Sequence, residues 1–309
     1  MCLPTRKGSF FWLLVLVGMV AFPTFSLAAT LHAILVGDTN DSSIGISVRV
    51  DMERLQVLVQ SISEHTGLTL NRQYITGDQL TRENVERTIN GASVDSDDVV
   101  FFFWNGHGNN AGESVLPTMG LKNGQLGLSQ VKTTLSAKNP RLLIVIGDTC
   151  NVGREGPVQN RRGNPKPENY RELFLKYRGT ILASGSKKGY YSWGSTDGGF
   201  YTLQFLDSLN DELSKSGRPS WNDLMSRADK VINVRPGVIQ PPQSKVEVSY
   251  VENVDGVGGG DSCRLGEPCN NTPAPGANWT CVTPEEEVGN DRRCCQASNG
   301  KRECWNVVW

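Results

Sequence analysis

One apolar segment in the middle of the chain constrains the fold more than any other. Residues 142–146 (Leu-Leu-Ile-Val-Ile) form an uninterrupted apolar run that Gly147 stops and polar residues follow at once. Such a run predicts a fully buried strand. In an open parallel sheet, ligands bind at the carboxyl ends of the strands. Cys150, just beyond this strand, therefore stands at the position of a nucleophile.

A second strand of the same kind delivers a histidine to the equivalent edge. Residues 98–104 (Asp-Val-Val-Phe-Phe-Phe-Trp) lead directly to His107, which lies between two glycines. A thiol attacks a carbonyl group only as the thiolate, so a cysteine nucleophile needs a neighbouring base, usually a histidine. Of the other two histidines, His32 lies inside a predicted buried strand and His65 at the end of a predicted helix. We therefore expect His107 and Cys150 to form a catalytic pair.

The glycines beside His107 allow the backbone to come close to a substrate. They predict that the Gly108 N–H, together with the Cys150 N–H, faces a developing oxyanion. Taken singly, each motif also fits a plain turn and a buried structural thiol. Their order on two predicted strands favours the catalytic interpretation.

Strands and helices alternate along most of the chain, which favours a mostly parallel sheet with helices on both faces. Apolar runs predict about six strands, and apolar residues at helical spacing predict the helices between them. The predicted strands are 31–36, 68–75, 98–104, 142–146, 179–184 and 245–250, and the predicted helices are 47–65, 81–89, 126–137, 170–177, 199–213 and 221–232. Residues 109–124 and 151–168 are predicted loops.

The amino-terminal segment has the layout of a secretory signal peptide. Arg6 and Lys7 precede an apolar run over residues 10–22, and Ser26-Leu27-Ala28 follows as a cleavage site. An uncleaved anchor is the alternative, but the run is shorter than the ~20 residues that a spanning helix needs. We expect cleavage after Ala28 and a secreted or periplasmic protein with no further membrane segment.

The cysteines divide into a lone thiol and a clustered set. Of 8 cysteines, Cys2 leaves with the predicted signal, and the other seven are Cys150 and six near the C-terminus. In an oxidising compartment the six can close three disulfides, whose pairing the sequence leaves open. The disulfide candidates are Cys263, Cys269, Cys281, Cys294, Cys295 and Cys304. A glycine run at 258–260 predicts a joint between a domain over 29–252 and this cysteine-rich region over 253–309.

The order of motifs over residues 31–250 resembles the caspase and metacaspase group of cysteine peptidases. That group has an aromatic-rich strand ending in His-Gly and, some forty residues later, a strand ending in Asp-x-Cys. The similar segments here are 102–108 (Phe-Phe-Trp-Asn-Gly-His-Gly), 113–117 (Glu-Ser-Val-Leu-Pro), 198–200 with 205–209, 220–224 and 240–243. The resemblance implies a caspase-like three-layer sandwich, a thiol protease, with His107 as base and Cys150 as nucleophile.

The resemblance also implies which substrates are cut. In that architecture the residue two before the nucleophile lines the primary pocket, and here it is Asp148. Asp51 falls where the family places a second pocket carboxylate, although a solvated helix-face carboxylate is an equal alternative. Two carboxylates in a partly buried pocket select a guanidinium or ammonium group, so we expect cleavage of proteins or peptides after arginine or lysine.

Self-cleavage is a further expectation. The predicted loop 151–168 carries Arg154, Arg161 and Arg162, so it offers a self-cleavage site between a large and a small portion, or is simply an exposed basic loop.

Cofactors and partners complete the expectations. Calcium-dependent metacaspases have an acidic cluster after the histidine, whereas residues 109–117 offer only Glu113, so we expect no cofactor and find no pattern that supports calcium activation. Net charge of -1 over 309 residues gives no reason to expect a nucleic-acid partner. We expect a monomer. The competing hypotheses are a catalytically inactive caspase-like binding scaffold and a legumain-like peptidase that cuts after asparagine.

Overall fold

A six-stranded sheet forms the centre of the protein. The computed structural model describes residues 29–109, 116–149 and 163–251, together with the backbone of 279–281, 292–297 and 302–306. The strand order is β13-β8-β7-β3-β1-β2, and only β13 runs antiparallel to its neighbour. The strands are β1 (Thr30–Gly37), β2 (Thr69–Thr76), β3 (Val99–Gly106), β7 (Leu142–Thr149), β8 (Tyr177–Ser184) and β13 (Gln243–Tyr250). This confirms the predicted mostly parallel sheet.

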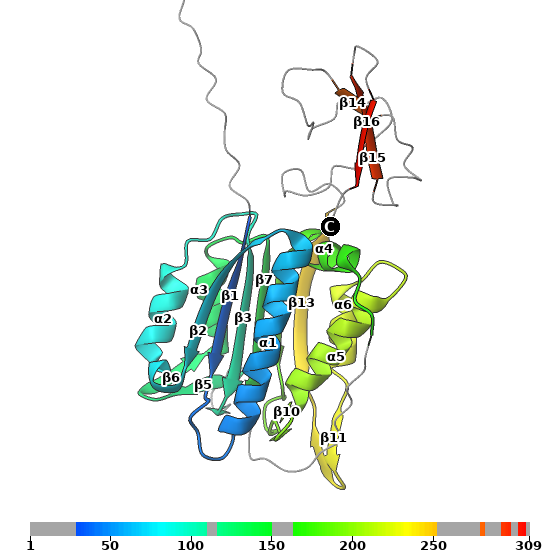
Figure 1. The fold of residues 1–309 in the computed structure, drawn as a ribbon. Helices are drawn as coiled ribbons and strands as arrows, with labels where there is room; N and C mark the ends of the chain where they lie inside the picture. Colours follow the sequence, from blue (N-terminus) through cyan, green and yellow to red (C-terminus); the bar gives the residue numbers. More distant parts are fainter. Residues whose placement is uncertain are drawn as a thin grey trace, which may run out of the picture.

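Helices cover both faces of this sheet because its strands are apolar on both sides. In β3, Phe101 and Phe103 pack into one core, whereas Phe102 and Trp104 point to the opposite face and pack into a second core. The first core is covered by α1 (Gly45–Thr66), α4 (Pro167–Leu175), α5 (Phe200–Ser214) and α6 (Trp221–Ala228), and the second by α2 (Arg82–Gly91) and α3 (Leu128–Ser136) (Figure 1). The three layers are those of the expected caspase-like sandwich.

Local signals explain where several helices begin and end. Gly67 adopts φ 76° and ends α1, and its N–H donates to the Ser63 carbonyl. Thr81, the predicted cap of α2, accepts a hydrogen bond from the Asn84 N–H. Pro167 begins α4 three residues before the predicted start, as a proline in the first turn favours.

Helix α6 is shorter than predicted. It ends at Ala228 instead of residue 232, because the Gln204 side chain of α5 donates to the carbonyls of Ala228 and Lys230, both at 2.7 Å. Ile232 instead begins β11 (Ile232–Arg235), which pairs with β12 (Val238–Gln240).

The carboxyl edge of the sheet carries additional small strands. The predicted loop 109–124 contains β5 (Thr118–Leu121), which pairs with β4 (Gly108–Asn109) and β6 (Gly124–Gly127). A short hairpin of β9 (Gly194–Ser195) and β10 (Gly198–Gly199) leads directly into α5, and η1 (Gly77–Gln79) follows β2. The start of α1 lies at this same edge (Figure 1).

Near the C-terminus, β14 (Trp279–Cys281), β15 (Arg292–Ala297) and β16 (Arg302–Asn306) form a separate antiparallel sheet. Its backbone register places Cys281 opposite Cys295 and Cys294 opposite Cys304. Cys263, Cys269 and the predicted signal peptide 1–28 lie outside the described residues. Within the part of the chain that the structure describes, no helix combines the length and apolar character needed to cross a membrane.

Candidate active site

The ends of β3 and β7, the strands that precede the two residues of the expected catalytic pair, lie at one edge of the sheet. These neighbouring parallel strands are in register through Gly106 and Thr149, their last residues. His107 follows Gly106 and Cys150 follows Thr149 in the chain. Cys150 itself, with residues 150–162, lies outside the described residues, as do Arg154, Arg161 and Arg162.

The backbone next to His107 approaches the end of β7 closely. A Cβ atom on Gly108 would lie 2.4 Å from the Thr149 Cγ2 atom and 2.7 Å from the Thr118 carbonyl oxygen, so only glycine fits there. The Gly120 N–H donates to the His107 carbonyl at 2.8 Å. Since hydrogen-bonded and non-hydrogen-bonded pairs alternate in an antiparallel ladder, the neighbouring pair Gly108–Met119 is non-hydrogen-bonded. The Gly108 N–H therefore points away from β5, and its role as an oxyanion donor stays a prediction.

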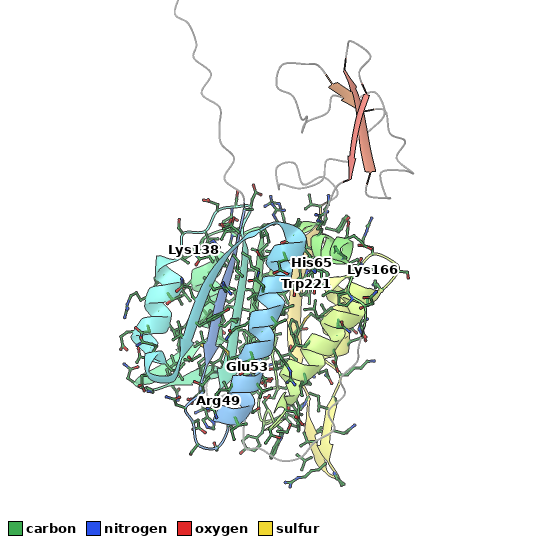
Figure 2. All side chains as sticks on the ribbon, in the orientation of Figure 1. Arg49, Glu53, His65, Lys138, Lys166 and Trp221 are labelled. Carbon is green, nitrogen blue, oxygen red and sulfur yellow. The ribbon has the colours of Figure 1, made fainter. Side chains whose placement is uncertain are left out.

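The other two histidines lie elsewhere, as predicted. His32 is 5% exposed within β1, and its Nε2 atom lies 3.0 Å from Asp98 Oδ2. His65 lies in the last turn of α1, with its ring 4.7 Å from that of Tyr170. Figure 2 shows Arg49 near the start of α1 and His65 near the opposite end, away from the edge that carries His107.

His107 contacts a carboxylate that the sequence did not single out. Its Nε2 atom lies 3.2 Å from Asp41 Oδ2. The other carboxylate oxygen of Asp41 accepts hydrogen bonds from the Ser43 N–H, the Ser43 hydroxyl and the Ile44 N–H. Burial acts to raise the pKa of Asp41, but these hydrogen bonds outweigh it and lower the pKa to about 2. The available signal was its place in a polar loop directly after β1, at the carboxyl edge.

Asp51 is a buried carboxylate, so its alternative assignment as a solvated helix-face residue is wrong. Its side chain on α1 is 0% exposed, and its Oδ2 atom accepts hydrogen bonds from Asn105 Nδ2 at 2.6 Å and the Gly199 N–H at 2.7 Å. Among the described residues, Oδ1 accepts no hydrogen bond and faces Arg54 Nη1 at 3.7 Å. Burial raises the pKa of Asp51 well above its ordinary value, and the nearby charge of Asp148 raises it further.

Asp148 lies next to the Asp51 site and is fully buried, with partners on both oxygens. Its Oδ1 atom accepts from the Ser192 hydroxyl at 2.8 Å, and its Oδ2 atom accepts from the Thr202 N–H at 3.0 Å and the Thr202 hydroxyl at 2.8 Å. Burial raises the pKa of Asp148, and the hydrogen bonds from Thr202 and Ser192 oppose that rise. The N-terminal end of α5 thus donates a backbone N–H to Asp148, and Gly199, its N-cap residue, donates to Asp51.

The β9–β10 hairpin closes over Asp51 through a glycine. Gly198 adopts φ +121°, and a Cβ atom there would lie 2.2 Å from Asp51 Oδ1. Backbone with no side chain therefore lies directly against Oδ1, the carboxylate oxygen that accepts no hydrogen bond among the described residues. The structure brings Asp51, Asp148 and the hairpin together at the carboxyl edge.

The described residues contain no group of three or more histidine, cysteine or acidic side chains able to hold a metal ion. Glu113, the one acidic residue predicted near the histidine, lies outside them. Calcium dependence therefore stays untested.

These features define a three-layer α/β protein with a histidine and two buried carboxylates at the carboxyl edge of a parallel sheet. Residues 42–248, more than half of the chain, match the family model described as the caspase domain. The chain belongs to the caspase family, which confirms the resemblance seen in the sequence and supports a caspase-like cysteine peptidase.

Other comparisons add less. No curated protein matches this sequence. Among solved structures, a protein from Geobacter sulfurreducens aligns over 74% of this chain and 96% of its own, with 14% sequence identity and a TM-score of 0.45.

Proposed function

We propose that this protein is a secreted or periplasmic cysteine endopeptidase that uses His107 and Cys150 and cuts after arginine or lysine. The observation that carries the proposal is the register of β3 and β7, in which Gly106 lies opposite Thr149. The residues that follow this pair in the chain are His107 and Cys150. The close packing of Gly108 on Thr149 supports the same arrangement.

The reaction proceeds through a thioester. His107 takes the thiol proton, and the thiolate of Cys150 attacks the scissile carbonyl carbon to form a C–S bond. The tetrahedral oxyanion is stabilised by the Gly108 and Cys150 N–H groups. The C–N bond then breaks, and the leaving amine takes the proton from His107. Water, deprotonated by His107, attacks the thioester carbon, the C–S bond breaks, and the carboxylic acid leaves as the thiolate returns.

The preference for a basic residue rests on Asp51 and Asp148. The buried Oδ1 atom of Asp51 accepts no hydrogen bond among the described residues, lies against Gly198 and faces the Arg54 guanidinium at 3.7 Å. A buried carboxylate oxygen without a donor is unfavourable, so an incoming guanidinium or ammonium group gains a charge-assisted hydrogen bond there. The partners of Asp148 hold it in place, and its Oδ1 atom, which accepts a single hydrogen bond among the described residues, keeps one lone pair for a further donor.

Hydrolysis of short peptides tests this function. Peptides ending in Arg, Lys, Asn or Asp before a fluorogenic amide are compared for the wild type, Cys150→Ala, His107→Ala and the control His65→Ala. We expect cleavage after Arg and Lys that Cys150→Ala abolishes, that His107→Ala lowers by about 100-fold or more, and that His65→Ala leaves near the wild-type rate.

Labelling with an iodoacetamide probe separates the competing hypotheses. The wild type is expected to react at Cys150, and His107→Ala is expected to react more slowly. An unreactive Cys150 with no hydrolysis would favour the binding scaffold. Cleavage confined to asparagine peptides would favour the legumain-like enzyme and contradict the proposed pocket.

A further inference from the structure

We propose that Asp41 is a positioning residue that holds the His107 ring in the orientation needed for catalysis. The inference deepens the proposed function and rests on it. It starts from one contact, in which Asp41 Oδ2 lies 3.2 Å from His107 Nε2. A base that is itself oriented by a third group is a recurrent arrangement in nucleophilic catalysis.

The surroundings of Asp41 fix the direction of its carboxylate. Its Oδ1 atom accepts from the Ser43 N–H at 2.7 Å, the Ser43 hydroxyl at 2.5 Å and the Ile44 N–H at 3.0 Å. Its backbone carbonyl accepts from the Gly45 N–H at 3.0 Å, where α1 begins. With Oδ1 occupied and the backbone tied to the helix, Oδ2 remains directed at His107.

The contact determines which ring nitrogen acts as the base. A carboxylate only accepts hydrogen bonds when ionised, and the pKa of about 2 keeps Asp41 ionised throughout the working range. The proton of a neutral His107 is therefore held on Nε2, and Nδ1 carries the free lone pair that takes the thiol proton. When His107 becomes an imidazolium, the same carboxylate stabilises the positive charge.

Asp38 is a second carboxylate near His107 and Asp41. Burial and the charge of Asp41 raise the pKa of Asp38, whereas the charges of His107 and Lys122 act to lower it. The Lys122 ammonium pairs with Asp78 at 2.7 Å. Asp38 thus supplies a matched control, because it is an acidic residue of the same loop for which the structure shows no ion pair with His107 among the described residues.

The tautomer of His107 is measured first, in the Cys150→Ala background, so that the result does not depend on peptidase activity. The chain has only 3 histidines, and the His107 signals in a long-range ¹H–¹⁵N spectrum are assigned by their loss in His107→Ala. We expect the Nε2–H tautomer with Asp41 and with Asp38→Asn. In Asp41→Asn the amide offers its NH₂ group to His107, which disfavours the Nε2–H form, and we expect the Nδ1–H population to rise.

Kinetics with an arginine peptide then test the role. Asp41→Asn keeps an oxygen for the Ser43 and Ile44 donors, so we expect thermal unfolding close to that of the wild type. We expect kcat to fall by about 100-fold with KM nearly unchanged. The acidic limb of the kcat/KM profile should move to lower pH, because the imidazolium loses its carboxylate and the neutral base persists to lower pH. Asp38→Asn is expected to change kcat far less, and Asp41→Glu to recover part of the loss.

Two failures are distinguishable. A wild type without Cys150-dependent hydrolysis overturns the proposed function and this role with it. An active wild type whose Asp41→Asn variant keeps kcat within about twofold, the same pH profile and the same His107 tautomer overturns only the role of Asp41.

Discussion

At the scale of single residues, three carboxylates at one sheet edge differ because their partners differ. Asp41 is partly exposed and has several donors, which lower its pKa to about 2. Asp51 and Asp148 are 0% exposed, and burial raises the pKa of each. The family resemblance indicated Asp51 and Asp148 as pocket residues from their positions in the sequence. No local sequence pattern, however, distinguishes a buried carboxylate from a solvated one. Only the surrounding atoms decide this.

The raised pKa of Asp51 predicts an effect of pH on selectivity. As pH rises through this pKa the carboxyl group ionises, so the kcat/KM ratio for arginine over the neutral isostere citrulline should rise with pH. In Asp51→Asn the ratio should be lower and should depend less on pH, because only Asp148 then remains to ionise. Peptide hydrolysis across the active pH range measures it. A ratio and a pH dependence that are unchanged in Asp51→Asn contradict this assignment.

The same residue links function to stability. An acid with a raised pKa contributes stability that is fully present below its ordinary value of 3.8 and is lost as pH rises through the raised value. Asp51→Asn should therefore increase the free energy of unfolding at pH 7 by on the order of 1 kcal/mol, and by less near pH 4. Denaturant unfolding at both values checks this, with Asp78→Asn at the exposed edge as the control.

At the scale of elements, the main strands follow from apolar runs and the small ones do not. Strands β1, β3 and β7 are buried at almost every position, so a short run is enough to predict each of them. Strands β4, β5 and β6 are two to four residues long and partly polar, so only their pairing reveals them. The early end of α6 likewise depends on Gln204, a residue of another helix.

Because β4 lies so close to the end of β7, adding one methyl group at Gly108 should lower both stability and activity. Gly108→Ala should cost about 1–3 kcal/mol of stability, because the new Cβ atom overlaps Thr149 and the Thr118 carbonyl. It should also lower kcat/KM, since His107 and the residue after Thr149 would move apart. Gly91→Ala, where a Cβ atom meets nothing within 4 Å, is the control. Equal effects of the two substitutions on stability and hydrolysis would exclude a tight contact at Gly108.

At the scale of the whole molecule, the proposed secretion predicts which cysteines are oxidised to disulfides and which one stays a free thiol. A protein secreted after cleavage behind Ala28 would begin at Ala29 and hold three disulfides among the six C-terminal cysteines, with Cys150 as a single free thiol. Alkylation without reductant followed by mass spectrometry should label only Cys150, and amino-terminal sequencing should read Ala29. Six labelled C-terminal cysteines would contradict the oxidising location. A second amino terminus within 151–168 would reveal self-cleavage there, and its absence would remove that proposal.

The sequence by itself determined the apolar strands, their alternation with helices and the two residues proposed to carry the chemistry. These features are local, because the spacing of apolar residues and the residue that ends each apolar run can be recognised within a short stretch of sequence. Only the tertiary structure decided that Asp41 meets His107 and that Asp51 is buried against Gly199, which lies 148 positions away. Such contacts depend on which strand ends and helix starts become neighbours, and burial and charge there result from all of them together.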